Sequence, residues 1–193
     1  MAHSRRILVL FMVLTGGVTC AICTPGQQSS MSRQEKVEKF LSVIRDRELQ
    51  QKDPNSFRAA IQELGKLRAA EAVDDLVKLL TYRREWQRER PAGDYITEGS
   101  SWTNYTGAAF PATTALENIG DAAVPALMRV IEGRDEASLE SKNARYTVRA
   151  IFTRRNRNAD AFFRAEATHA VSPEAARRLL NAVQTADQDW KPE

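Results

Sequence analysis

The sequence predicts an all-α protein, a short right-handed α-solenoid of helical hairpins with one long inserted loop. Three observations lead to this prediction. Apolar residues recur at helical spacing through nearly all of the chain after Ser32. Two segments, residues 60–80 and 115–133, repeat one pattern of apolar, polar and glycine positions. Helical spacing is lost between them, over residues 85–110, where one proline and three glycines occur.

The composition is that of a soluble globular protein. The chain has 193 residues, of which 42% are hydrophobic and 27% are charged. The formal net charge of +3 includes Arg5 and Arg6, and the rest of the chain holds 26 basic against 25 acidic side chains. Because binding to a phosphate backbone needs a clear excess of positive charge, we expect no nucleic-acid partner.

The N-terminus has the order of residues found in a secretory signal peptide. Arg5 and Arg6 precede an apolar run at residues 7–14, and small residues follow up to position 23. We therefore predict a signal peptide at residues 1–23, cleaved after Ala21 or Cys23, and export to the periplasm or the cell exterior. A retained N-terminal anchor is the alternative, although the apolar stretch is short for a membrane span.

Both cysteines, Cys20 and Cys23, fall in this segment, so the mature chain has no internal disulfide framework. Thr19 and Ile22 precede them, where a lipoprotein signal has a small residue, and we expect no lipid anchor. Residues 24–32 are small and polar and predict a flexible tether. Residues 33–193 then form a single domain, with the inserted loop at 85–110.

The first helices follow from apolar spacing and capping residues. One helix is predicted over residues 33–51, and a second begins at Asp53, an N-cap residue that is followed by Pro54. The apolar stripes in the first half of the domain are Val37, Phe40, Leu41 and Ile44, then Phe57, Ile61 and Leu64, then Val73, Leu76, Val77 and Leu80.

The second half repeats the pattern. Leu64-Gly65 followed by Val73 corresponds to Ile119-Gly120 followed by Val124-Pro125-Ala126-Leu127. Over residues 57–186 this sequence pattern resembles that of a bacterial HEAT-repeat protein. The resemblance implies HEAT-like helical hairpins stacked on one another. We predict one continuous core made of Ile61, Leu64, Val73, Leu76, Leu80, Leu116, Ile119, Val124, Leu127 and Ile131.

A third, less regular unit is predicted to cap the stack. Its last helix begins at Ser172, an N-cap residue, with Pro173 at the first helical position. Its apolar residues are Tyr146, Val148, Ala150, Ile151 and Phe152, then Ala159, Phe162, Phe163 and Ala167, then Ala176, Leu179, Leu180 and Val183.

The inserted loop is the candidate binding site, because a loop this long in a small domain is often functional. Its aromatic and charged residues suit partner recognition, although the aromatic side chains could instead fold back and cover the ends of the helices. The candidate binding residues are Arg84, Trp86, Arg88, Arg90, Asp94, Tyr95, Trp102 and Tyr105.

No catalytic constellation is recognised. His169 is the only histidine after the N-terminal segment, which excludes sites built on two imidazoles, and no nucleophile elbow or phosphate-binding loop occurs. We expect no metal, no cofactor and no catalytic residue. Two clusters of arginines occur, at residues 83–90 and 149–157. The first is interpreted as an ion-paired helix end, with binding of a peptide carboxylate or an acidic polymer as the alternative.

The sequence thus favours an exported, non-enzymatic module of the bacterial cell envelope that binds a protein or peptide. The alternative is an envelope enzyme or enzyme accessory that acts on a carbohydrate or a chromophore-like ligand through the 85–110 loop, since two carboxylates suffice for glycoside chemistry.

The signal peptide gives the first testable prediction. N-terminal sequencing of the protein purified from its native host should begin after Ala21 or after Cys23, because charge, apolar run and small residues stand in the order that signal peptidase requires. A cytoplasmic chain that begins at Met1 or Ala2 would contradict the prediction.

Overall fold

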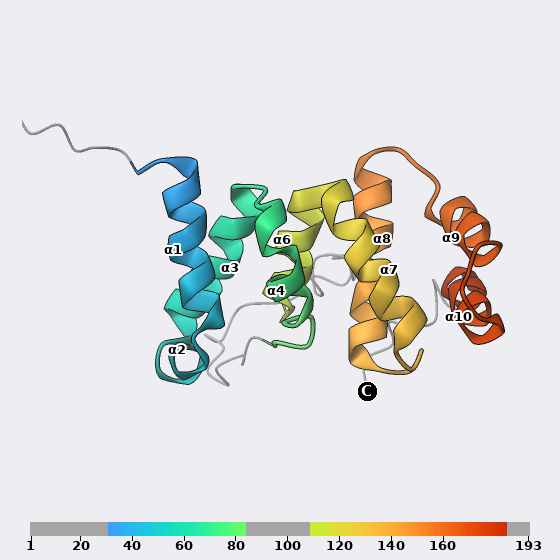
Figure 1. Ribbon diagram of the computed structural model, residues 1–193, viewed down its shortest axis with the longest axis horizontal. Coiled ribbons are helices and arrows are strands. Elements are labelled where there is room, and N and C mark those ends of the chain that lie inside the picture. The colour runs from blue at the N-terminus through green and yellow to red at the C-terminus, as the bar shows by residue number, and fades with distance from the viewer. Residues whose placement is uncertain (1–30, 84–108, 185–193) are drawn as a thin grey trace, which may run out of the picture. The chain divides into compact units, whose positions relative to one another are not determined.

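The computed structural model describes residues 31–83 and 109–184. All regular secondary structure in these residues is helical, which confirms the predicted all-α stack of HEAT-like hairpins (Figure 1). The elements are α1 (Arg33–Arg45), α2 (Arg47–Lys52), α3 (Pro54–Lys66), η1 (Ala70–Ala72), α4 (Val73–Val77), α6 (Pro111–Ile119), η2 (Gly120–Ala123), α7 (Val124–Gly133), α8 (Leu139–Arg154), α9 (Ala159–Ala167) and α10 (Pro173–Gln184).

The helix expected over residues 33–51 is interrupted. Asp46 is extended, with φ −83° and ψ 103°, and its carboxylate accepts hydrogen bonds from the backbone N–H groups of Glu48 and Leu49. The aspartate therefore ends α1 and caps a second helix, α2, which buries no residue. The single-helix prediction was wrong because apolar spacing carries no information about a local cap.

The first repeat follows its sequence signals closely. Asp53 caps α3 through the N–H of Ser56, at 3.0 Å, and Pro54 occupies the first turn. After η1, helix α4 is short, because the N–H groups of Leu79 and Leu80 bond to carbonyls three residues back. This tight turn still buries Leu80.

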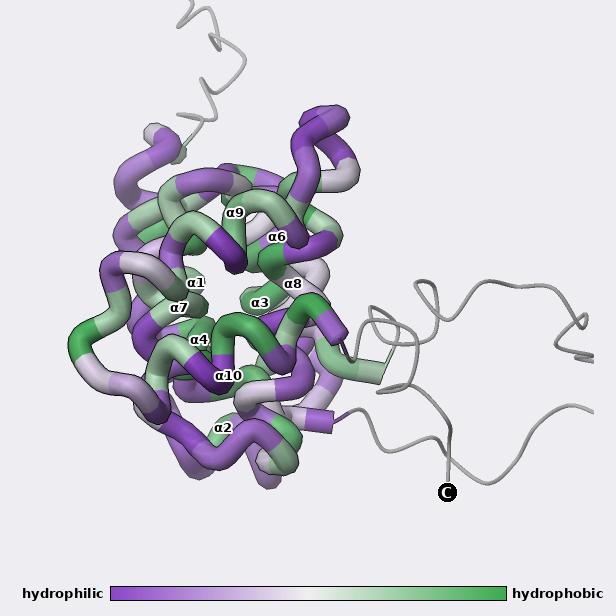
Figure 2. The backbone as a smooth tube through the Cα atoms, turned by 90° about the vertical axis from the view of Figure 1, so that its right-hand side faces the viewer, coloured by the Kyte–Doolittle hydropathy of each residue, from purple (hydrophilic) through white to green (hydrophobic). Residues whose placement is uncertain are grey.

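The helices form two layers. Helices α3, α6 and α8 follow one another in one layer, and α1, α4 and α7 lie beside them in the other, as the view along the stack shows (Figure 2). Each hairpin places one helix in each layer, with η1 and η2 at the turns. The hairpin of α9 and α10 closes the stack, with α10 packed against α7.

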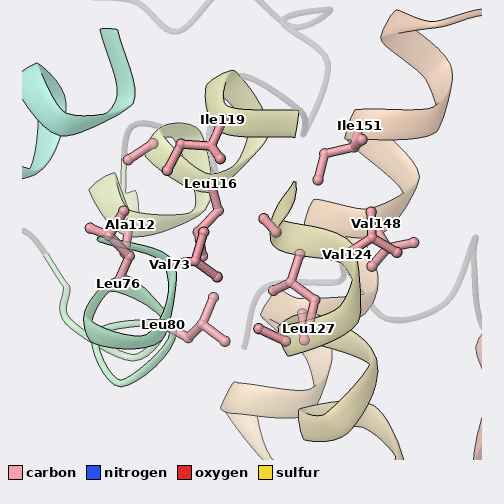
Figure 3. Packing of buried hydrophobic residues seen from close by; sticks show 14 of the residues in the cluster. Val73, Leu76, Leu80, Ala112, Leu116, Ile119, Val124, Leu127, Val148 and Ile151 are labelled. Carbon is pink, nitrogen blue, oxygen red and sulfur yellow. The ribbon is translucent and has the colours of Figure 1, made fainter. Parts of the chain in front are cut away.

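The core runs continuously between the layers (Figure 3). The close view shows side chains of α4, α6, α7 and α8 meeting one another, among them Leu76, Leu116 and Leu127. All ten residues of the predicted core are buried and belong to one cluster: Ile61, Leu64, Val73, Leu76, Leu80, Leu116, Ile119, Val124, Leu127 and Ile131. This prediction is confirmed.

The cap of the stack differs in detail from its prediction. Ser172 accepts a hydrogen bond from the N–H of Ala175, as an N-cap does, but α10 buries Ala175, Leu179 and Ala182. Leu180, expected in the core, is 41% exposed. The buried stripe is thus shifted by one position, because α10 turns its small residues toward its neighbours.

Helix α8 also buries polar side chains that apolar spacing does not reveal. The side-chain amide of Asn143 donates to the carbonyl of Leu80 at 2.7 Å, and this contact ties α8 to the turn after α4. The hydroxyl of Thr147 donates to the carbonyl of Asn143 within the helix. The side-chain NH₂ group of Asn143 and the hydroxyl of Thr147 thus have hydrogen-bond partners, whereas the side-chain oxygen of Asn143 has none among the described residues.

The two glycines that match in the repeats have different roles. Gly65 lies inside α3, where an added Cβ would stand 2.7 Å from the Cα of Ala115 on α6. Gly120 ends α6 with φ +83°, a conformation that favours glycine. Gly65 therefore permits close approach of two helices, and Gly120 permits a sharp turn.

Several predictions lie outside the described residues. These are the signal peptide at 1–23, most of the tether at 24–32 and nearly all of the inserted loop at 85–110. Within the described part of the tether, the Ser32 side chain and Glu35 form a capping box that begins α1.

The close approach of α3 and α6 gives a testable prediction. Replacing Gly65 with alanine should lower the free energy of unfolding by about 1–3 kcal/mol, because the contact is with backbone that cannot rotate away. The matched control is Gly133→Ala, where a Cβ meets no atom within 4 Å and stability should hold or rise slightly. Urea unfolding of both variants measures this, and an equal effect of the two changes would refute the assigned role of Gly65.

Candidate functional site

The residues predicted to bind a partner are not among those described. They are Arg84, Trp86, Arg88, Arg90, Asp94, Tyr95, Trp102 and Tyr105. The described residues instead offer three surface grooves, each between helices of neighbouring hairpins.

The first groove lies between α3 and α6 and has a volume of about 280 Å³. Its lining includes the polar residues Gln62, Lys66 and Asn118 together with Pro111 and Ala115. The side-chain oxygen of Asn118 accepts a hydrogen bond from Arg154 at 2.7 Å, so part of its polar surface is already used within the fold.

The second groove, of about 450 Å³, lies at the meeting point of η2, α7, α8 and α9. Its aromatic floor includes Phe152, which packs on Phe162 with ring centroids 4.6 Å apart. The guanidinium of Arg157 stands 4.2 Å from the Phe152 ring centroid and also pairs with Asp121, which receives Arg155 as well. The cations of this groove are therefore engaged by groups of the same chain.

The second arginine cluster, residues 149–157, is paired with carboxylates of the same chain. Arg149 pairs with Asp160 at 2.6 Å, and Arg154 pairs with Glu117 at 2.6 Å. With the two arginines on Asp121, all four basic residues of the cluster are ion-paired.

The third groove lies between α4 and α7 and has a volume of about 480 Å³. Its apolar residues are Val77, Ala126 and Val130, and its rim carries charges. The lining residues are Asp74, Val77, Lys78, Ala126, Arg129, Val130, Gly133 and Arg134. We call this surface the α4–α7 groove.

Asp74 and Asp75, in the first turn of α4, organise the charges around this groove. Asp74 pairs with Arg129 across the groove at 3.2 Å, and both side chains are exposed, at 78% and 68%. Asp75 is 18% exposed and binds Arg45 of α1 at 2.7 Å and Lys78 at 3.2 Å. Asp75 thus joins α1 to α4, and Asp74 joins α4 to α7.

The pKa of Asp75 reflects this position. Burial alone would raise the pKa of the carboxyl group, but hydrogen bonds and charge attraction from Arg45 and Lys78 outweigh burial. The pKa therefore lies below its ordinary value of 3.8, and the carboxylate is the favoured form in the folded chain.

The residue spacing in the sequence already contained features of the α4–α7 groove. The search for apolar residues at helical spacing did not use them. Asp74 and Lys78 are four residues apart, and Ala126, Arg129 and Val130 share the spacing of one helix face. Asp74, Lys78 and Arg129 are exposed, whereas Ala126 is buried, so the groove runs along the edge of the buried stripe. What the sequence does not show is that these two faces, about fifty residues apart in the chain, lie side by side.

Comparison with known proteins gives a match for the hairpin of α3 and α4, which forms one side of this groove. Residues 57–82 match the family model of the PBS lyase HEAT-like repeat. The match covers α3, η1 and α4, which form one HEAT-like hairpin. No curated protein and no solved structure matches the chain significantly. The chain is therefore a helical repeat scaffold with HEAT-like hairpins.

Two further properties concern residues 31–83 and 109–184 alone. None of their helices has the length and apolar character needed to cross a membrane. Nor do three His, Cys, Asp or Glu side chains of this part come close enough to hold a metal ion.

The pairing of Asp75 predicts a dependence of stability on pH. Because the pKa is lower in the folded chain, the unfolded chain binds the proton more readily, and the contribution of Asp75 is lost as pH falls below 3.8. In the variant Asp75→Asn, the free energy of unfolding should fall by about 1 kcal/mol at neutral pH, and the difference from the unaltered chain should shrink in acid. Chemical unfolding at several pH values measures this.

Asp74→Asn is the matched control for this experiment, since the exposed pair with Arg129 should contribute less to stability. A difference between Asp75→Asn and the unaltered chain that stays constant from neutral pH to well below 3.8 would contradict the assigned pairing.

Proposed function

We propose that the chain is an exported, non-enzymatic scaffold that binds a protein or peptide on the surface of its stacked HEAT-like hairpins. The proposal of export is supported by the N-terminal pattern of charged, apolar and small residues. The proposal of binding is supported by the HEAT-like stack and by the grooves between its helices.

The shape of the grooves is the observation that carries the binding proposal. Sites for small molecules are concave and bury most of the ligand surface. The two larger grooves, at about 450 and 480 Å³, are open to solvent and extend across neighbouring helices. Such open surfaces suit the side chains of an extended peptide or of another protein better than they suit an enclosed substrate.

The inserted loop at 85–110 remains part of this proposal as a prediction from sequence. Its tryptophans and arginines are residue types that dominate protein interfaces. Binding by the loop and binding in a groove are compatible, because a partner of ordinary size covers about 800 Å² of each surface.

Affinity capture tests the proposal. The mature chain, immobilised and exposed to an envelope fraction of its native host, should retain a specific protein, and that protein when purified should bind with a saturable, one-step isotherm. An immobilised chain that has been heat-unfolded is the control for nonspecific adsorption. Failure to retain any protein above this control would refute the binding proposal, and recovery of the mature chain in the cytoplasm would refute export.

A further inference from the structure

The lining of the α4–α7 groove holds more basic than acidic residues. Its lining includes three basic residues, Lys78, Arg129 and Arg134, but only one acidic residue, Asp74. In the second groove, by contrast, the carboxylate of Asp121 holds both neighbouring arginines. Of the three grooves described above, the α4–α7 groove has the largest excess of basic over acidic lining residues.

The partners of these three cations show how strongly each is held. Arg129 is paired with Asp74 in an exposed contact, and Lys78 shares Asp75 with Arg45. Arg134, just after the end of α7, is exposed and forms no ion pair with any described residue. Exposed ion pairs contribute little, so an incoming carboxylate can compete with Asp74 for Arg129 at small cost.

The positive residues come from both sides of the groove. Arg129 lies on α7, and Arg134 directly follows the last residue of this helix, Gly133. Lys78 lies on the opposite side, directly after the end of α4. A groove with cations on both sides suits an extended segment of chain that carries several carboxylates.

The apolar lining decides between the kinds of anion that this groove fits. Val77, Ala126 and Val130 provide aliphatic surface between the charged walls. None of the lining residues is aromatic, so the groove has no platform on which bases of a single-stranded nucleic acid could stack. An acidic peptide, by contrast, can place aliphatic side chains on this surface between its carboxylates.

We propose that the α4–α7 groove binds an acidic, leucine-containing peptide segment of a partner protein. In this interaction Arg129, Arg134 and Lys78 meet the carboxylates, and Val77 and Val130 contact the aliphatic side chains. This inference rests on the proposed binding function, and it adds the chemical class of the partner and the surface that it occupies.

Peptide binding tests the inference directly. The probe is a fluorescein-labelled peptide, Gly-Glu-Leu-Asp-Glu-Leu-Asp-Gly, titrated with the mature chain and followed by fluorescence anisotropy. A second peptide with lysine at every acidic position keeps the leucines and reverses the charge, and a mixed-sequence single-stranded DNA oligonucleotide is the third probe. The acidic peptide should bind alone among the three, and its affinity should fall as salt is raised.

Three variants locate the site. Lys78→Glu combined with Arg134→Glu should weaken binding of the acidic peptide at least about tenfold, because attraction is replaced by repulsion. Gly133→Leu should also weaken binding, since residue 133 lines the groove and open space surrounds its missing Cβ, so the added side chain narrows the groove without changing charge. Arg164→Glu on α9, an exposed arginine outside the groove, should leave binding within about twofold. Thermal unfolding checks that each variant is folded.

The outcomes separate this inference from the function on which it rests. Equal binding of the lysine peptide, stronger binding of the DNA, or an equal loss in the Arg164→Glu variant would overturn the inference. So would a captured envelope protein that binds the groove variants as tightly as the unaltered chain, although the proposed binding function would then stand. If the chain captures no protein and binds no peptide, both fail.

Discussion

Gly65 allows α3 and α6 to approach so closely that a Cβ at this position would lie 2.7 Å from the Cα of Ala115. The rest of the stack depends on this contact. Because α4 and α7 follow α3 and α6 through short turns, η1 and η2, the spacing of the first layer fixes that of the second. Leu76, Leu116 and Leu127 can then share one core, and close packing of this kind tolerates little change in volume. A larger residue at position 65 would separate both layers at once.

Charged groups join the helices on the surface of this core. In the second layer one arginine crosses each junction, and the groups joined are Arg45 with Asp75, Arg129 with Asp74, and Arg178 with the carbonyl of Glu132. The exposed pair of Arg129 and Asp74 adds little to stability, which comes mainly from the buried apolar area. Where the cations outnumber the carboxylates, as along the α4–α7 groove, they remain available to a partner, and this connects the architecture of the stack to the proposed binding of an acidic segment.

The predictions that succeeded rest on interactions local to one helix. Asp53 caps α3 as predicted, because the cap needs only its own side chain and an N–H three residues on. Leu64, Leu76 and Leu127 are fully buried as predicted, because apolar residues at helical spacing must face a core wherever the helix lies. The same reasoning failed at Asp46, where a local cap interrupts a continuous stripe, and at Leu180, where α10 buries alanines in place of larger residues.

The sequence by itself determined the helical class, the repeat, the ten core residues and the starts of α1, α3 and α10, since each depends on contacts within a few residues or on one amphipathic face. Only the tertiary structure decided which glycine allows two helices to approach closely and which ends a helix, since Gly65 and Gly120 have the same place in the repeat. It also decided the candidate site. The α4–α7 groove is assembled from residues near 74–78 and 126–134, and its surplus of positive charge depends on which carboxylates each cation reaches across helix junctions. Such distances are a property of packing, and no spacing along the chain encodes them.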